Sequence, residues 1–270
     1  MTINTLFAKW ARCKPRVTTV SSIGTTAENR AIPLIKIGER ADEAKPAFWI
    51  DGAIHSGEWL SATTALGMAE KLLPRMSGLA RDERDEISKL RSCMDFYIAP
   101  MLNPDGYAFA RTDTNPTNVR DVVLRHRQNL KAFLNLHSFG QEWFYSFGDA
   151  PGKYPEDVDE LRRVANLAID AIRAVNSNIT YSLGSARDIT GYNGSGSSMD
   201  WAKSVVGLKY VYTVELPPAF SKERYLSMTD NGFMVDDEEA VQATAQTFEA
   251  VKVIAKEVLK SYGSERCRSW

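Results

Sequence analysis

The stretch that decides the fold is Ala47-Phe48-Trp49-Ile50-Asp51-Gly52-Ala53-Ile54-His55-Ser56-Gly57-Glu58-Trp59. Its apolar beginning predicts a buried strand, and a helical pattern begins at Leu60. His55 and Glu58 therefore stand where a strand gives way to a helix, three residues apart, so that one turn of backbone can direct both side chains at one point. They would form half of a catalytic zinc site, which takes three protein ligands and leaves a fourth position for water. A lone pair of this spacing is also typical of a core histidine near a surface glutamate, so the rest of the chain must decide.

Composition describes an ordinary globular chain. It has 270 residues, 44% of them hydrophobic, which suits one sizeable core. The formal net charge of -1 indicates neither a nucleic-acid partner nor an anionic membrane surface. We find no apolar run long enough to span a bilayer and no signal peptide at the N-terminus. Three scattered cysteines, Cys13, Cys93 and Cys267, predict neither a disulfide framework nor a cysteine metal site.

Predicted strands and helices alternate along the chain without a linker or a repeat. This pattern predicts one α/β domain, with a mostly parallel sheet covered by helices. The domain is expected over residues 5–260, and residues 261–270 form a C-terminal tail. Further buried strands are expected at residues 95–101, 132–136 and 208–216, and long helices at residues 60–73, 157–175 and 238–260.

The chain has only three histidines, which limits the choice of a third ligand. His126 lies within a predicted helix and is expected to be structural or exposed. His137, like His55, falls at the end of a predicted strand, where ligands bind in open α/β sheets. Glu215 also ends a strand, so it is the candidate general base that accepts a proton from water at the metal. The alternative for Glu215 is an exposed residue at the end of a strand.

Five motifs carry a family resemblance: His55–Trp59, Asn103–Tyr107, His137–Gln141, Ser197–Trp201 and Tyr210–Leu216. In this order they resemble the zinc carboxypeptidases of the pancreatic A/B type, over about residues 5 to 258. The resemblance implies an eight-stranded mixed sheet with helices on both faces. It also implies a monomeric, extracellular enzyme that acts on the C-termini of peptides or proteins, with neither nucleic acid nor membrane as a partner.

The resemblance also implies the roles of single residues. One zinc per chain is bound by His55, Glu58 and His137, and Glu215 is the base. Tyr192 matches the mobile tyrosine that closes over the terminal carboxylate of the substrate; without the resemblance it is an exposed loop tyrosine. Met199 matches the floor of the specificity pocket, where an apolar residue implies a preference for apolar or aromatic C-terminal residues; otherwise it fills a gap in the core.

The chain departs from the family pattern at two places. Gly57 stands where the family usually has an arginine that polarises the scissile carbonyl. The family also has a long segment before the third ligand, with arginines for the oxyanion and the terminal carboxylate. Here the interval from Tyr107 to His137 is short and has neither motif, so the domain is expected to be internally shortened between about residues 112 and 118. We expect no arginine at the carboxylate site; Arg111 or Arg187 beside Tyr192 in the cleft would contradict this.

Three functions compete. The first is a metallocarboxypeptidase that removes apolar C-terminal residues. The second is a non-catalytic relative, or a truncated form, that binds zinc and peptide; the missing arginines favour it, whereas the His55, Glu58, His137 and Glu215 set opposes it. The third is a zinc amidohydrolase for a small acylated amino acid, which the match of Tyr192 and Met199 opposes. The family resemblance favours the first, and whether the chain turns over substrate depends on its site residues rather than on its fold.

Overall fold

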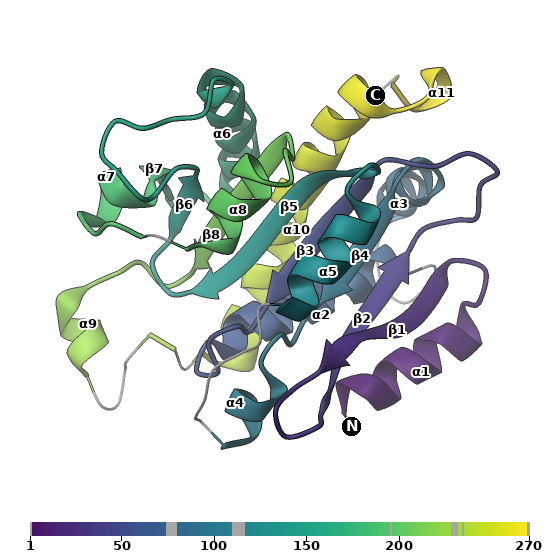
Figure 1. Ribbon diagram of the computed structural model, residues 1–270, viewed down its shortest axis with the longest axis horizontal. Helices are drawn as coiled ribbons and strands as arrows, with labels where there is room; N and C mark the ends of the chain where they lie inside the picture. The colour runs from purple at the N-terminus through teal and green to yellow at the C-terminus, as the bar shows by residue number, and fades with distance from the viewer. Residues whose placement is uncertain are drawn as a thin grey trace.

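The computed structural model describes residues 2–73, 80–109, 117–194, 196–227, 232–233 and 235–268 (Figure 1). The strands are β1 (Thr18–Thr25), β2 (Ala31–Ile37), β3 (Ala47–Gly52), β4 (Asp95–Ala99), β5 (Leu130–Ser138), β6 (Glu142–Tyr145), β7 (Ser182–Ser185) and β8 (Tyr210–Leu216). The helices are α1 (Ile3–Cys13), α2 (Trp59–Leu72), α3 (Arg81–Cys93), α4 (Pro104–Phe109), α5 (Thr117–His126), α6 (Val158–Val175), α7 (Ala186–Thr190), α8 (Ser198–Ser204), α9 (Lys222–Leu226), α10 (Asp237–Tyr262) and α11 (Glu265–Arg268).

The strands form one eight-stranded sheet in the order β1-β2-β4-β3-β5-β8-β6-β7. Strands β4, β3, β5 and β8 run parallel and make up its centre. Strands β1 and β2 add an antiparallel edge, and β6 and β7 continue the sheet beyond β8. The sheet is therefore mixed and mostly parallel, which confirms the predicted fold class.

Helices cover both faces of the sheet. In Figure 1, α5 and α8 lie in front of it, whereas α2 and α10 lie behind. The central strands are buried on both faces, so their residues alternate between two cores. Phe48 and Ile50 belong to the core under α2, α6 and α10. Trp49 and Phe133 belong to the other core, together with Met199 of α8. This second face carries the site described below.

The motif that begins at Asn103 leads directly into the short helix α4. The Asn103 side chain accepts a hydrogen bond from the Gly106 amide at 2.8 Å and donates one to the Ile54 carbonyl at 3.1 Å. The first bond satisfies an amide of the first helical turn, as capping side chains do. The second ties α4 to the loop that carries His55.

The cysteines, whose number and spacing predicted no disulfide framework, form one disulfide. Cys93, the last residue of α3, is bonded to Cys267 in α11, 174 positions later in the chain. Such a pair cannot be read from sequence spacing, because it depends on how the end of the chain folds back onto the core. Cys267 is buried, so α11 is tied to the core, whereas Cys13 is a free, exposed thiol.

No helix in the described part of the chain is long and apolar enough to span a membrane.

Candidate metal centre

Strand register brings the candidate site together at the carboxyl ends of three neighbouring parallel strands. Asp51 of β3 is paired with Asn135 of β5, and His137 of β5 is paired with Glu215 of β8. His55 follows β3 in the loop that leads to α2, and Glu58 is the residue immediately before that helix. Ligands in open α/β sheets bind at such strand ends.

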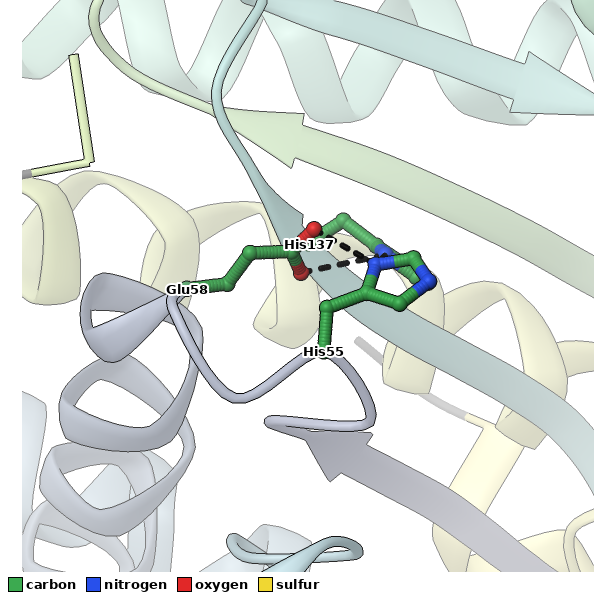
Figure 2. Close-up of side chains that lie close together, drawn as sticks. All are labelled: His55, Glu58 and His137. Carbon is green, nitrogen blue, oxygen red and sulfur yellow. Dashed lines mark hydrogen bonds and ion pairs between the residues drawn. The ribbon is translucent and has the colours of Figure 1, made fainter. Parts of the chain in front are cut away.

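Three side chains converge at one point, as Figure 2 shows for His55, Glu58 and His137. Their ligand atoms all lie within 4.8 Å of one another. The Glu58 carboxylate lies 2.6 Å from Nδ1 of His55 through one oxygen and 3.1 Å from Nδ1 of His137 through the other. The two Nδ1 atoms are 3.3 Å apart. Glu58 makes no cap hydrogen bond to α2, because its carboxylate is turned to the histidines.

This arrangement fits a zinc ion. Two nitrogens at about 2.0–2.1 Å from a tetrahedral zinc are themselves about 3.4 Å apart, close to the separation of the two Nδ1 atoms. Oε2 of Glu58 is buried and faces Nδ1 of His137, which is itself a candidate ligand. Two imidazoles and a carboxylate are the ligand set of many catalytic zinc sites, which keep a further position open.

The charges of these groups depend strongly on one another. Burial opposes ionisation of Glu58, but hydrogen bonds from His137 and His55 outweigh it and lower the pKa of Glu58. Burial likewise opposes a charge on His137, yet the contact with Glu58 and the charges of Glu215 and Asp51 raise the pKa of His137 to about 9. Without metal, His137 is therefore protonated at neutral pH, and a metal must displace that proton.

A second set of hydrogen bonds lies behind His137. Its Nε2 contacts Oδ1 of Asn135, and Nδ2 of Asn135 donates to the Asp51 carboxylate. The other oxygen of Asp51 accepts from Nε1 of Trp49 at 2.6 Å. Burial raises the pKa of Asp51 to about 6 against these two hydrogen bonds, so Asp51 is ionised at neutral pH.

Glu215 lies beside His137 on the adjacent strand. Burial raises the pKa of Glu215 to about 7; the nearby His137 opposes this, and the charges of Glu58 and Glu142 add to it. A carboxyl group with a pKa near neutrality can both accept and return a proton, as a general base must.

A cleft of about 840 Å³ opens from these groups. His55, His137 and Glu215 line one part of it, and its other walls are mainly apolar side chains: Ile54, Leu102, Val119, Phe144, Met199, Trp201 and Val205. Met199, predicted at its floor, lines the cleft, is 2% exposed and also packs in the core between sheet and α8.

The other predicted residues lie apart from the metal ligands. Tyr192 is 79% exposed in the loop before α8 and does not line the cleft. Arg187 does not line it either, and Arg111 lies outside the described residues. His126 is remote from the ligands, with its Nδ1 3.4 Å from the hydroxyl of Tyr97.

Sequence reasoning missed three residues of the site. Asp51 and Asn135 support His137, and the available signal was their position at strand ends, with Asn135 two residues before His137 and therefore on the same face. Arg120 of α5 lines the cleft and is the permanently charged cation there among the described residues. Its place depends on how α5 packs over the sheet, which the sequence did not indicate.

Comparison with known proteins agrees with this geometry. A family model described as zinc carboxypeptidase matches residues 3–121 and 115–250. The chain belongs to the zinc carboxypeptidase family. Curated relatives include carboxypeptidase B of Astacus astacus, 28% identical over 96% of each chain, and carboxypeptidase A2 of Mus musculus, 27% identical over 75% of this chain and 58% of the relative. The solved structure of the Helicoverpa armigera carboxypeptidase A superposes with a TM-score of 0.80 at 24% identity, covering 94% of this chain and 71% of the other, and shows the same fold.

Family membership makes the chain a metallocarboxypeptidase, a class of hydrolases, and zinc the metal expected at its His-Glu-His site. The alignment with the Astacus enzyme spans 313 positions, more than the 270 residues of this chain. The relative therefore contains residues for which this chain has no counterpart. The family model changes from its first to its second matched piece at residues 115–121, in the interval where the sequence lacks the arginine motifs.

Proposed function

We propose that this protein is a zinc exopeptidase that hydrolyses the last peptide bond of peptides with an apolar or aromatic C-terminal residue. The observation that supports this most is the convergence of two histidines and one buried carboxylate beside Glu215, at the mouth of an apolar cleft. The position of Glu215 beside the three candidate ligands favours catalysis over the non-catalytic alternative, since a binding protein has no need of a partly buried carboxyl group there.

His55 and His137 hold one zinc per chain through their Nδ1 atoms, and Glu58 holds it through its carboxylate. When bound, zinc acts as a Lewis acid that polarises the substrate carbonyl and makes water more acidic. Glu215 takes the proton of the attacking water and delivers it to the leaving amine. Its position beside His137 at the end of the adjacent strand supports this role.

The C-terminal side chain of the substrate lies in the apolar part of the cleft, with Met199 at its floor and Phe144 on its wall. Burying an aromatic side chain there contributes roughly 2–3 kcal/mol of binding, whereas a charged side chain would lose hydration against these apolar walls. Tyr192 is exposed in a glycine-containing loop, and we assign it the closing motion over the bound substrate.

Exopeptidase selectivity needs a cation for the terminal carboxylate, and Arg120 is the residue we assign to it. The guanidinium lies 2.9 Å from the carboxylate of its neighbour Asp121, and both side chains are about half exposed. Exposed pairs of this kind contribute little stability. Arg120 can therefore exchange Asp121 for a substrate carboxylate at low cost and gain a charge-assisted hydrogen bond in the cleft.

The disulfide between Cys93 and Cys267 supports an extracellular location, because disulfides persist in oxidising compartments. We propose that the protein is secreted and acts as a monomer.

The test is turnover of two blocked dipeptides, one ending in Phe and one in Arg, by zinc-loaded protein. We expect release of free phenylalanine at a kcat/KM at least about tenfold above that for arginine, since the apolar wall discriminates by more than about 1.4 kcal/mol. Preference for arginine would contradict the specificity. Zinc binding without release of either residue would favour the non-catalytic alternative.

A further inference from the structure

One buried acid next to the site has no role in the reaction described so far. Asp51 is 1% exposed, stands at the end of β3 and lies four residues before His55. Burying a carboxylate is costly unless it is hydrogen-bonded. Both of its oxygens are used, one by Nε1 of Trp49 and the other by Nδ2 of Asn135.

The hydrogen bonds from Asp51 to the metal site can run in only one direction. Because the ionised Asp51 carboxylate can only accept, the amide of Asn135 must turn its NH₂ group to Asp51 and its oxygen to His137. That oxygen can also only accept, so Nε2 of His137 must carry a proton and donate it. The remaining nitrogen, Nδ1, faces His55 and Glu58, and once its proton is displaced it presents its lone pair there, as a metal ligand requires.

The two histidines differ in how firmly their rings are held. The His137 side chain is 12% exposed and is held at both ring nitrogens. The His55 side chain is 66% exposed, and Nδ1 makes its hydrogen bonds and ion pair within the described residues, on the metal side. An imidazole that is fixed in orientation and tautomer loses less freedom when it binds a metal.

We propose that Asp51 and Asn135 are positioning residues that fix the tautomer and orientation of His137, so that His137 is the preset ligand of the zinc and His55 completes the site. Through Asn135, the negative charge of Asp51 also strengthens His137 as an electron donor to the metal. This inference rests on the zinc-binding part of the proposed function and is independent of turnover.

The test compares three variants with the parent in zinc affinity, measured by competition with a chromophoric chelator, and in the NMR signal of the His137 Nε2 proton. Asn135→Leu removes the link and keeps the branching of the side chain. The double variant Asp51→Asn with Asn135→Asp exchanges carboxylate and amide, and it can keep all three hydrogen bonds: Trp49 to Asn, Asn to Asp, and His137 to Asp. Thr247→Val is the control, because it removes a buried hydrogen bond in α10, away from the site.

Asn135→Leu should bind zinc about 10- to 100-fold more weakly and lose the slowly exchanging Nε2 proton. The exchanged double variant should recover both zinc affinity and the proton signal, since it presents a carboxylate directly to His137. Thr247→Val should lower the melting temperature while leaving zinc affinity unchanged.

Parent-like zinc affinity in Asn135→Leu would overturn the proposal. So would a folded double variant that binds zinc as weakly as Asn135→Leu, because loss of packing alone would then explain the defect. The parent protein could also bind no zinc and still show the His137 Nε2 proton. The proposed function would then fail, and the tautomer would be a property of the fold alone. That result would also overturn the role of Asp51 and Asn135 in zinc binding.

Discussion

Zinc affinity should fall steeply as the pH is lowered below 9. In the metal-free protein the pKa of His137 is raised to about 9, chiefly by Glu58 against the effect of burial. Below that pH the imidazole holds a proton on Nδ1, because Nε2 already donates to Asn135. Zinc and this proton compete for the same lone pair, so one proton leaves for each zinc bound.

The expected magnitude follows from one displaced proton. Affinity should decrease about tenfold for each pH unit between 8.5 and 6.5, about 100-fold over the window, and level off above pH 9. The lowered pKa of Glu58 keeps that ligand ionised throughout the window, so Glu58 adds nothing to the pH dependence of zinc affinity. The assay is chelator competition at constant ionic strength, corrected for the chelator's own protonation, with titration calorimetry in two buffers to count protons. A zinc affinity that is the same at pH 8.5 and pH 6.5 would refute the reasoning.

Substitutions at four positions test the remaining roles. Glu215→Gln should keep zinc stoichiometry and fold but abolish hydrolysis, whereas Glu58→Gln should weaken zinc retention and regain part of its activity with excess metal. Elemental analysis and the phenylalanine assay distinguish the two variants. Loss of zinc from Glu215→Gln would contradict the role of Glu215 as base. Arg120→Met should raise KM about 10- to 100-fold for a substrate with a free C-terminal carboxylate and leave an amidated analogue unaffected; equal effects on both would exclude carboxylate recognition. Gly57→Arg should raise kcat by about 100-fold or more over Gly57→Met, because a guanidinium there would polarise the scissile carbonyl. A Cβ at this position meets no atom within 4 Å, so there is room for the side chain. Equal rates for the two variants would show that this position does not face the reacting carbonyl.

The sheet and its main helices could be predicted because each has a strong local pattern. The apolar run before Asp51 indicated β3, and the 3.6-residue period from Leu161 to Ile172 indicated α6. Strand β7 was not predicted, since Ser182–Ser185 has no apolar run and is ordered by pairing with β6. Short strands of this kind depend on tertiary context more than on their own residues.

The candidate ligands could be proposed from sequence because the motifs fix His55 and Glu58 within one turn and place His137 at a strand end. The hydrogen bonds of Asp51 and Asn135 behind His137 could not be predicted, because they join residues of different strands. Asp51 and Asn135 are 84 positions apart and meet only through the register of β3 and β5. The same holds for Arg120, which reaches the cleft through the packing of α5, and for the disulfide between Cys93 and Cys267.

The central claim is that three named side chains hold a catalytic zinc through particular atoms. It is tested most directly by an anomalous difference map from crystals of the zinc-loaded protein, measured at the zinc absorption edge. We predict a single peak per chain, about 2.0–2.2 Å from Nδ1 of His55, Nδ1 of His137 and a carboxylate oxygen of Glu58, with Glu215 outside ligand distance. A peak bound through Nε2 of His137, a zinc ligated by Glu215, or no peak between the two histidines would contradict the account.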